Sequence, residues 1–255
     1  MIYARYRIDG EARWGWVEGH RVGAIVGDPF GAHSRGQAMA DLSEVTLLAP
    51  CQPAKIIAVG ANFPGRADEL DRSLPLVPQI LLKPPSAVIG PEQAILLPPQ
   101  SNQVEHEAEL AVVIGRQARW VTPEEALGYV LGYTCANDVT ARDLEQADRQ
   151  LTRAKAFDTF CPLGPWIVTG LDPADLVIFC SVSGQVRQMT STREMAFNVP
   201  QLIAFISSIM TLEPGDVILA GTPAGVGPLR DGERVEIEIE GVGRLANPVA
   251  RPPTE

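Results

Sequence analysis

Three glutamates with an alternating spacing are the first candidates for chemistry in this sequence. Glu105, Glu107 and Glu109 lie in VEHEAELAVVIG, directly before a continuous apolar run. Residues two apart share one face of a strand but point in nearly opposite directions on a helix, so the three carboxylates gather only if this stretch is a strand. Packed carboxylates raise one another's pKa unless a cation or protons balance them. Such a cluster would suit a hard divalent ion, namely Mg²⁺, Mn²⁺ or Ca²⁺.

A second glutamate trio shows why this spacing alone does not identify a metal site. In RVEIEIEG, near the end of the chain, three glutamates alternate with valine and isoleucine, as expected of a half-exposed strand with a solvated charged face. The first trio lacks this clean alternation, so two interpretations remain for it, a metal site and a solvated face. The residues that follow it, Asp138, Arg142 and Lys155, favour a divalent ion with cationic anchors for an anionic substrate.

The elements that must position these residues are mainly short strands. Residues 1–27 alternate in polarity around an Asp-Gly pair and predict a small β-meander, whereas residues 28–52 are interpreted as a mixed connector. KIIAVG, which begins at Lys55, predicts a strand buried on both faces. Residues 63–79 contain three prolines and little periodicity, which predicts a long loop or lid.

Two helices have clear start signals. Thr122 and Glu125 predict a capping box at the start of TPEEALGYVLG, and Asn198 precedes an amphipathic stretch. LEPGDVILAGTPAGVG predicts a turn, a strand and a glycine-rich loop. Because strands outnumber helices and do not alternate regularly with them, we expect a β-rich α+β fold. We expect a small N-terminal domain over residues 1–52 and a larger catalytic domain over residues 53–250.

Composition and charge narrow the class of protein. The 255 residues are 45% hydrophobic and 20% charged, as is typical of a globular protein. The net charge of −10 argues against nucleic acid or an anionic membrane as a partner. Because MIYARYRIDG lacks the apolar region of a secretory signal and no apolar run could span a bilayer, we expect a cytoplasmic protein. The four cysteines form no CxxC pair, so we expect reduced, partly buried thiols.

Five motifs, in order, resemble those of the fumarylacetoacetate hydrolase family. They are ILLKPPSAVIGP, VEHEAELAVVIG, GYTCANDVTARD, KAFDTFCPLGPWIV and LEPGDVILAGTPAGVG. The resemblance implies a mixed β-roll preceded by a small N-terminal domain, a homodimer, and one divalent cation (Mg²⁺, Mn²⁺ or Ca²⁺). It also implies 2-oxo acids or 1,3-dicarbonyl acids as substrates. The reaction would be C–C bond hydrolysis, decarboxylation or isomerisation through a stabilised enolate.

The same resemblance implies roles for individual residues. The metal ligands that it implies are Glu107, Glu109 and Asp138, with Glu105 outside this set. The substrate contacts that it implies are Arg142, Glu145, Gly221 and Thr222. Lys155 matches the active-site lysine. Two interpretations are open for Lys83 in LLKPPS, a packing and turn role, which we favour, and a position that faces the active site. Relatives often carry glutamine where this chain has Glu145, so either the substrate polarity differs or Gln146 takes this role.

One departure from the family pattern concerns proton transfer. Many members carry a lid segment GLNYxxHxxE, but this sequence reads GANFPGRADE, so Arg66 replaces the histidine while Glu69 keeps the glutamate. Arginine stays protonated and cannot act as a general base. This weakens hydrolysis by an activated water. It affects decarboxylation less, because loss of CO₂ needs mainly an electron sink and Arg66 could hold a second carboxylate. Isomerisation needs a proton carrier, for which Glu69 or Lys155 could serve. His106 is expected to point to the face opposite Glu107.

Two classes of function therefore remain open. One is a metal-dependent enzyme that acts on 2-oxo or enol dicarboxylic acids. The other is a family member that binds the metal and an oxo acid without turnover. An Arg66 side chain directed to solvent, with no other base near the metal, would favour the binding protein.

Overall fold

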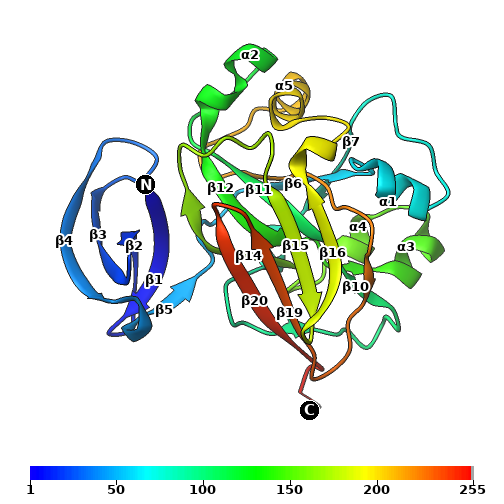
Figure 1. The fold of residues 1–255 in the computed structure, drawn as a ribbon, viewed down its shortest axis with the longest axis horizontal. Helices are drawn as coiled ribbons and strands as arrows, with labels where there is room; N and C mark the ends of the chain where they lie inside the picture. Colours follow the sequence, from blue (N-terminus) through cyan, green and yellow to red (C-terminus); the bar gives the residue numbers. More distant parts are fainter. Residues whose placement is uncertain (254–255) are drawn as a thin grey trace.

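The computed structural model describes residues 1–253, and its architecture is dominated by strands (Figure 1). The largest sheet contains β1 (Ile2–Ile8), β2 (Glu11–Glu18), β3 (Arg21–Gly27), β4 (His33–Asp41), β5 (Thr46–Leu48), β6 (Ile56–Gly60), β7 (Gln79–Lys83), β8 (Val88–Ile89), β11 (Ala108–Ile114), β12 (Val130–Asn137), β14 (Cys161–Val168) and β17 (Val217–Leu219). Its order is β4-β3-β2-β1-β14-β12-β11-β17-β6-β7, with β5 paired to β1 and β8 paired to β14.

Two smaller sheets complete the strand framework. A five-stranded sheet has the order β16-β15-β19-β20-β9, and a three-stranded sheet has the order β13-β10-β18. The five strands are β9 (Ile95–Leu96), β15 (Val177–Val182), β16 (Gln185–Ser191), β19 (Arg234–Ile239) and β20 (Gly243–Ala250). The three strands are β10 (Val104–His106), β13 (Thr140–Ala141) and β18 (Gly227–Pro228). The β-rich α+β expectation is confirmed.

The core lies on both faces of β11, as the apolar run LAVVIG predicts. Leu110 and Val112 pack with residues of β15 and β19 between the large and the five-stranded sheet. Ala111 and Val113 pack on the opposite face, with residues of β6 and β17. The glutamates at the start of this strand therefore stand at the edge of two buried layers.

The N-terminal meander forms as predicted, but the connector that follows it does not. Asp9 and Gly10 adopt positive φ angles of 51° and 81° in the turn between β1 and β2. Residues 28–52, expected to be a connector, contain β4 and β5. The pattern missed β4 because it is mostly exposed and has no apolar face, while its pairing with β3 is supplied by the backbone. β1 also pairs with β14, at Ile2–Val168 and Tyr3–Ile167. The division after residue 52 stays a prediction.

Helices are short, and several surround one end of the molecule (Figure 1). The α-helices are α1 (Pro64–Glu69), α2 (Pro123–Ala126), α3 (Arg142–Asp148), α4 (Thr152–Lys155) and α5 (Val199–Ile209). The 3₁₀ helices are η1 (Leu42–Glu44), η2 (Pro85–Ala87), η3 (Leu127–Tyr129) and η4 (Thr192–Glu194). In Figure 1, α1, α3 and α4 lie together on the side remote from the N-terminal meander.

One loop prediction and one helix prediction differ from the structure. The predicted lid over residues 63–79 contains α1. The predicted helix TPEEALGYVLG ends after one turn at Ala126, its next three residues form η3, and its last three begin β12. α5 forms where Asn198 predicts its start. The long ladder of β12 with β11 outweighs the local helix signal, because tertiary pairing overrides propensity over so few residues.

Two further sequence expectations concern the cysteines and the membrane. All four cysteines are buried and free, as expected. Burial raises the pKa of Cys51, Cys161 and Cys180 to about 12, so these thiols stay protonated at neutral pH. Within residues 1–253, the helices are too short to cross a membrane.

Candidate metal and substrate site

The candidate site forms where two adjacent strands break at the same level. β10 ends at His106 and β11 begins at Ala108, so Glu107 lies between two sheets. β12 ends at Asn137, and Asp138 follows it directly. The N–H of Glu107 donates to Oδ1 of Asn137, and the N–H of Asp138 donates to the carbonyl of Glu107, both at 2.9 Å. These bonds hold the two carboxylates beside each other.

Glu107, Glu109 and Asp138 form a buried carboxylate triad. One oxygen from each lies within 4.8 Å of the others. Glu109 is 1% exposed, and its carboxylate accepts the N–H of Gly221 at 2.6 Å but has no ion-pair partner in residues 1–253. Burial, and then the charge of Asp138, raise the pKa of Glu109 well above its usual value. A buried carboxylate in this state requires a proton or a cation, so the donor set fits a divalent ion.

Two lysines contact the carboxylates of Glu107 and Asp138. Nζ of Lys155 lies 2.6 Å from Oε2 of Glu107 and 2.5 Å from Oδ2 of Asp138. Burial alone would lower the pKa of Lys155, but Asp138, Glu107 and Glu109 outweigh it and raise this pKa, so the ammonium form persists. Nζ of Lys83, at the end of β7, lies 2.7 Å from Oδ1 of Asp138. Of the two interpretations of Lys83, the structure therefore favours a position at the site over the packing and turn role, because its buried Nζ contacts a site carboxylate.

Arg142, the first residue of α3, connects the triad to two further carboxylates. Its Nε lies 2.8 Å from Oε2 of Glu105, and its two terminal nitrogens pair with Glu107 and Glu145. Burial would raise the pKa of Glu107, but Lys155, Arg142 and Arg66 outweigh it and lower this pKa to about 2. Glu107 is therefore ionised.

The structure also distinguishes between Glu145 and Gln146 at the position where the sequence departs from its relatives. Glu145 lines the cavity and contacts Arg142. Gln146 is exposed. The acidic side chain therefore stands at the cavity, and no shift by one residue brings the amide there.

Arg66 points into the site. Its side chain is buried, with Nη2 at 3.5 Å from Oε1 of Glu107, while Nη1 pairs with Oε2 of Glu69. The other oxygen of Glu69 accepts the N–H of Gly225 at 3.2 Å. Arg66 is therefore not directed to solvent, which is the orientation that would have favoured a binding protein.

The glycine-rich loop after β17 braces the strand of glutamates. The hydroxyl of Thr222 donates to the carbonyl of Ala108 at 2.9 Å and accepts from Nε2 of Gln188 at 2.8 Å. The N–H of Gly221 is committed to Glu109. His106 is fully buried, with Nδ1 at 3.1 Å from Oε1 of Gln188, and burial lowers its pKa. Its ring is therefore neutral and lies away from the cavity.

A cavity of about 70 Å³ brings most of the predicted site residues together. Those that line it are Arg66, Glu107, Glu109, Asp138, Arg142, Glu145, Lys155 and Thr222. Glu69 and Gly221 contact residues of this set without lining the cavity. Arg72 and Gln79 also line it, and no motif in the sequence indicated them. Their position in the poorly patterned lid segment left no local signal.

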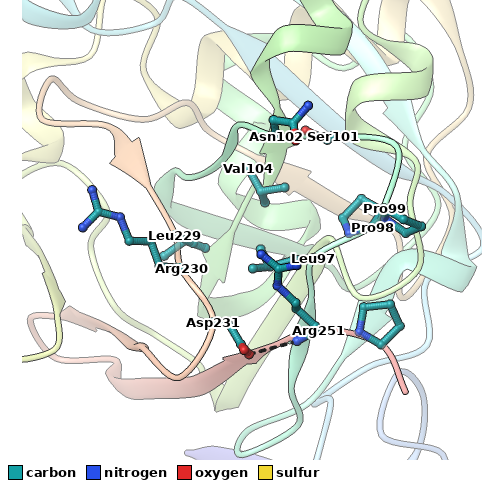
Figure 2. A pocket seen from close by; sticks show the side chains of 11 residues that line it. Leu97, Pro98, Pro99, Ser101, Asn102, Val104, Leu229, Arg230, Asp231 and Arg251 are labelled. Atoms are coloured by element: carbon teal, nitrogen blue, oxygen red, sulfur yellow. Dashed lines mark hydrogen bonds between the residues drawn. The ribbon is translucent and has the colours of Figure 1, made fainter. Parts of the chain in front are cut away.

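A larger cleft elsewhere does not have the character of a reaction centre. Figure 2 shows this cleft of about 630 Å³, with Leu97, Val104 and Leu229 among its apolar lining residues. Arg251 also lines this cleft, and its backbone N–H donates to Oδ1 of Asp231 at 3.1 Å. The residues described as lining this cleft include no cluster of buried carboxylates and cations, so the smaller cavity is the better candidate site.

Comparisons with known proteins cover nearly the whole chain. The family model for the fumarylacetoacetate hydrolase C-terminal domain matches residues 55–250, and a model for the Rv2993c-like N-terminal domain matches residues 1–50. A mitochondrial oxaloacetate tautomerase of Bos taurus is 43% identical over 220 residues, which cover 81% of this chain and 70% of that protein.

Two solved structures are similar over nearly the whole chain. A 2-hydroxyhepta-2,4-diene-1,7-dioate isomerase of Mycobacterium marinum has a TM-score of 0.93 and 43% identity, with both chains covered to 100%. A maleylpyruvate hydrolase of Sphingobium sp. SYK-6, solved with manganese(II) and pyruvate, has a TM-score of 0.82 and 33% identity, covering 99% of this chain and 100% of that one. These likenesses confirm the predicted fold. Since the family model spans most of the sequence, this chain belongs to the fumarylacetoacetate hydrolase family.

Proposed function

We propose that the protein is a divalent-metal-dependent tautomerase that interconverts the keto and enol forms of a 2-oxo dicarboxylic acid such as oxaloacetate. The observation that carries this proposal is the content of the cavity. A buried carboxylate triad is contacted by four cationic side chains, and no histidine lies among the residues described as lining it. Such a site can hold an oxo acid and move a proton, but it offers no imidazole to activate water.

The triad would hold the metal. Three carboxylates suit Mg²⁺ or Mn²⁺, with Ca²⁺ as a further possibility. The manganese in the similar maleylpyruvate hydrolase structure supports this assignment. When bound, the ion would draw electron density from the 2-oxo group and make the neighbouring C–H more acidic.

The protein's own residues would handle the protons. Lys155 would act as a protonated donor to the oxygen of the 2-oxo or enol group, and the stabilisation of its ammonium form by three carboxylates supports this role. Glu69 would carry the proton that leaves or joins the carbon, held in place by Arg66 and by the N–H of Gly225. In the keto-to-enol direction, the Glu69 carboxylate would take the proton from carbon while the Lys155 ammonium gives one to oxygen, and the proton then returns from Glu69 to Lys155 through solvent. The enol-to-keto direction runs the same transfers in reverse, so the reaction consumes no water and no further reactant.

Substrate contacts would come from the remaining lining residues. Arg142 and Thr222 face the cavity and would bind the carboxylate beside the oxo group, with Glu145 orienting the guanidinium. Arg66 adds a positive charge near Glu107 without acting as a base. Gly221 would act indirectly, because its N–H holds Glu109.

The test is to follow the loss of enol absorbance of oxaloacetate with purified protein and Mn²⁺ or Mg²⁺. The expected result is a rate above the uncatalysed one that excess EDTA abolishes. Pyruvate would be measured in the same samples, since its release above background would indicate decarboxylation instead. Metal binding without turnover would favour the oxo-acid-binding protein.

C–C bond hydrolysis is the second candidate, favoured by the likeness to maleylpyruvate hydrolase. It would require Glu69 to activate water, because Arg66 cannot. Maleylpyruvate and acetylpyruvate assayed under the same conditions decide between the two: cleavage of either at a rate above enol conversion of oxaloacetate would replace the tautomerase proposal.

A further inference from the structure

The cavity is lined by four cationic side chains, and three of them are already paired. Arg66, Arg142 and Lys155 each contact at least one carboxylate of the site. Arg72 lines the same cavity, but within residues 1–253 no carboxylate lies within ion-pair distance of its guanidinium. Because the other three cations that line the cavity already contact carboxylates, the guanidinium of Arg72 is the one available to an incoming anion.

The backbone at Arg72 is anchored. Its N–H donates to the carbonyl of Ala67 at 2.9 Å and so ties the residue to the end of α1, directly after Asp71 in a left-handed conformation with φ of 51°. Arg72 and Gln79 are exposed, whereas the triad is buried. The cavity therefore has a closed end that holds the triad and an open end that holds Arg72.

Three leucine side chains form an apolar wall of the same cavity. Leu70, Leu81 and Leu151 line the cavity together with the polar residues. A ligand with an anionic group at each end and a short carbon chain between them would match this arrangement. The wall would exclude water from the carbon at which the proton moves.

The charge balance of the closed end explains why a second carboxylate needs a partner of its own. Four cations, Arg66, Arg142, Lys83 and Lys155, contact the carboxylates of the site. The carboxylates in these contacts and in the triad are Glu69, Glu105, Glu107, Glu109, Asp138 and Glu145. A divalent ion would cancel the formal charge that remains. A dianionic substrate then brings two negative charges that this balance does not compensate. Among the residues described as lining the cavity, Arg72 offers an unpaired positive charge to the carboxylate farther from the metal.

We propose that Arg72 is a specificity-determining residue that binds the second carboxylate of a dicarboxylic 2-oxo acid at the open end of the cavity. This inference rests on the proposed function, which it deepens by naming the substrate feature that is recognised. The planar guanidinium can bind a carboxylate through two parallel hydrogen bonds, and lysine would reproduce the charge but not this geometry.

The test compares oxaloacetate with its 4-methyl ester, which keeps the carbon skeleton but lacks the second charge. Wild type should prefer oxaloacetate, and Arg72→Ala should raise KM for oxaloacetate roughly ten- to a hundred-fold, as expected for the loss of hydrogen bonds between charged groups. KM for the ester should not change. Arg72→Lys should recover part of the preference. Arg230→Ala, at the separate cleft in Figure 2, is the matched control and should resemble wild type.

Calorimetric binding of the same two compounds, in the presence of Mn²⁺, separates this inference from the proposed function. If wild type binds oxaloacetate more tightly than the ester, and Arg72→Ala removes the difference, the inference holds even without turnover, and only the proposed function fails. Equal affinity of wild type for both compounds, binding of neither, or an equal loss for both in Arg72→Ala would overturn it.

Discussion

At the residue scale, Glu109 offers the sharpest test of the metal site. Glu109→Gln keeps the size of the side chain and removes its charge, so affinity for Mn²⁺ should fall at least about tenfold, since a hard ion prefers a carboxylate. The metal-free protein should be as stable as wild type or more stable by about 1 kcal/mol, because burying Glu109 without a cation costs either the desolvation of its charge or the uptake of a proton, and glutamine requires neither. Calorimetric Mn²⁺ titration and urea unfolding with EDTA measure both effects.

The chain provides a matched control for this variant. Glu238 belongs to the second glutamate trio, and it is exposed on β19. Glu238→Gln should leave both Mn²⁺ affinity and stability unchanged. Unaltered Mn²⁺ affinity in Glu109→Gln would contradict the assignment of the triad as the metal site.

Lys83 gives a prediction of opposite sign in stability. Its ammonium is buried against Asp138, so Lys83→Met should destabilise the metal-free protein. The cost should be about 2–3 kcal/mol, near the low end for a broken buried pair, because Lys155 still contacts Asp138. Mn²⁺ should restore part of this loss by compensating the freed charge. Urea unfolding with and without Mn²⁺ measures it, and a variant as stable as wild type without metal would refute the role given to the pair.

At the scale of the elements, the features that depend on residues close together in the sequence could be predicted. The double-sided burial of β11 and the start of α5 could be read from the sequence, because both depend on periodicity and on neighbouring caps. The break at Glu107 could not be read. It arises because β10 pairs with β13 and β18 while β11 pairs with β12 and β17, and these partners are distant in sequence.

The candidate site shows the same division between local and distant information. The triad and Lys155 could be proposed from motifs, the motif around Lys83 left its role undecided, and nothing in the sequence indicated Arg72. Lys83 reaches Asp138 only because β7 pairs with β6 in the large sheet. Arg72 reaches the cavity only because α1 folds within a segment that has little periodicity.

The cap of α5 gives a prediction at this scale. Oδ1 of Asn198 accepts the N–H of Gln201 at 3.0 Å, and the Gln201 side chain accepts the N–H of Asn198 at 2.9 Å. Asn198→Ala should lower the free energy of unfolding by about 1 kcal/mol. Activity per folded molecule should not change, because α5 does not line the cavity.

Thr122→Ala is the comparison for this variant. Thr122 forms a capping box with Glu125 at the start of α2, but this helix has a single turn, so the loss of its cap should cost less. Urea unfolding of both variants decides the matter. An equal cost for the two would contradict the view that capping matters in proportion to the length of the helix that it starts.

At the scale of the whole molecule, exposed apolar side chains on one face indicate how a homodimer could form. Met189 and Val186 on β16 are 72% and 59% exposed, and Val177 on the neighbouring β15 is 43% exposed. Val177 and Met189 line a cleft that also includes Phe63 and Pro64, at the start of α1. Exposed apolar groups gathered in this way mark protein interfaces.

We therefore expect a homodimer that buries this face. Met189→Glu should convert it to a monomer, because a charge would be desolvated at the contact. Since α1 carries Arg66 and begins at the same cleft, dissociation should also lower turnover. Val26→Glu is the control: Val26 is 60% exposed but lies at the end of β3, in the meander remote from β16 (Figure 1), so the dimer should persist. Size-exclusion chromatography with light scattering measures the mass, and a monomeric wild type, or a dimeric Met189→Glu, would show that this face stays open in solution.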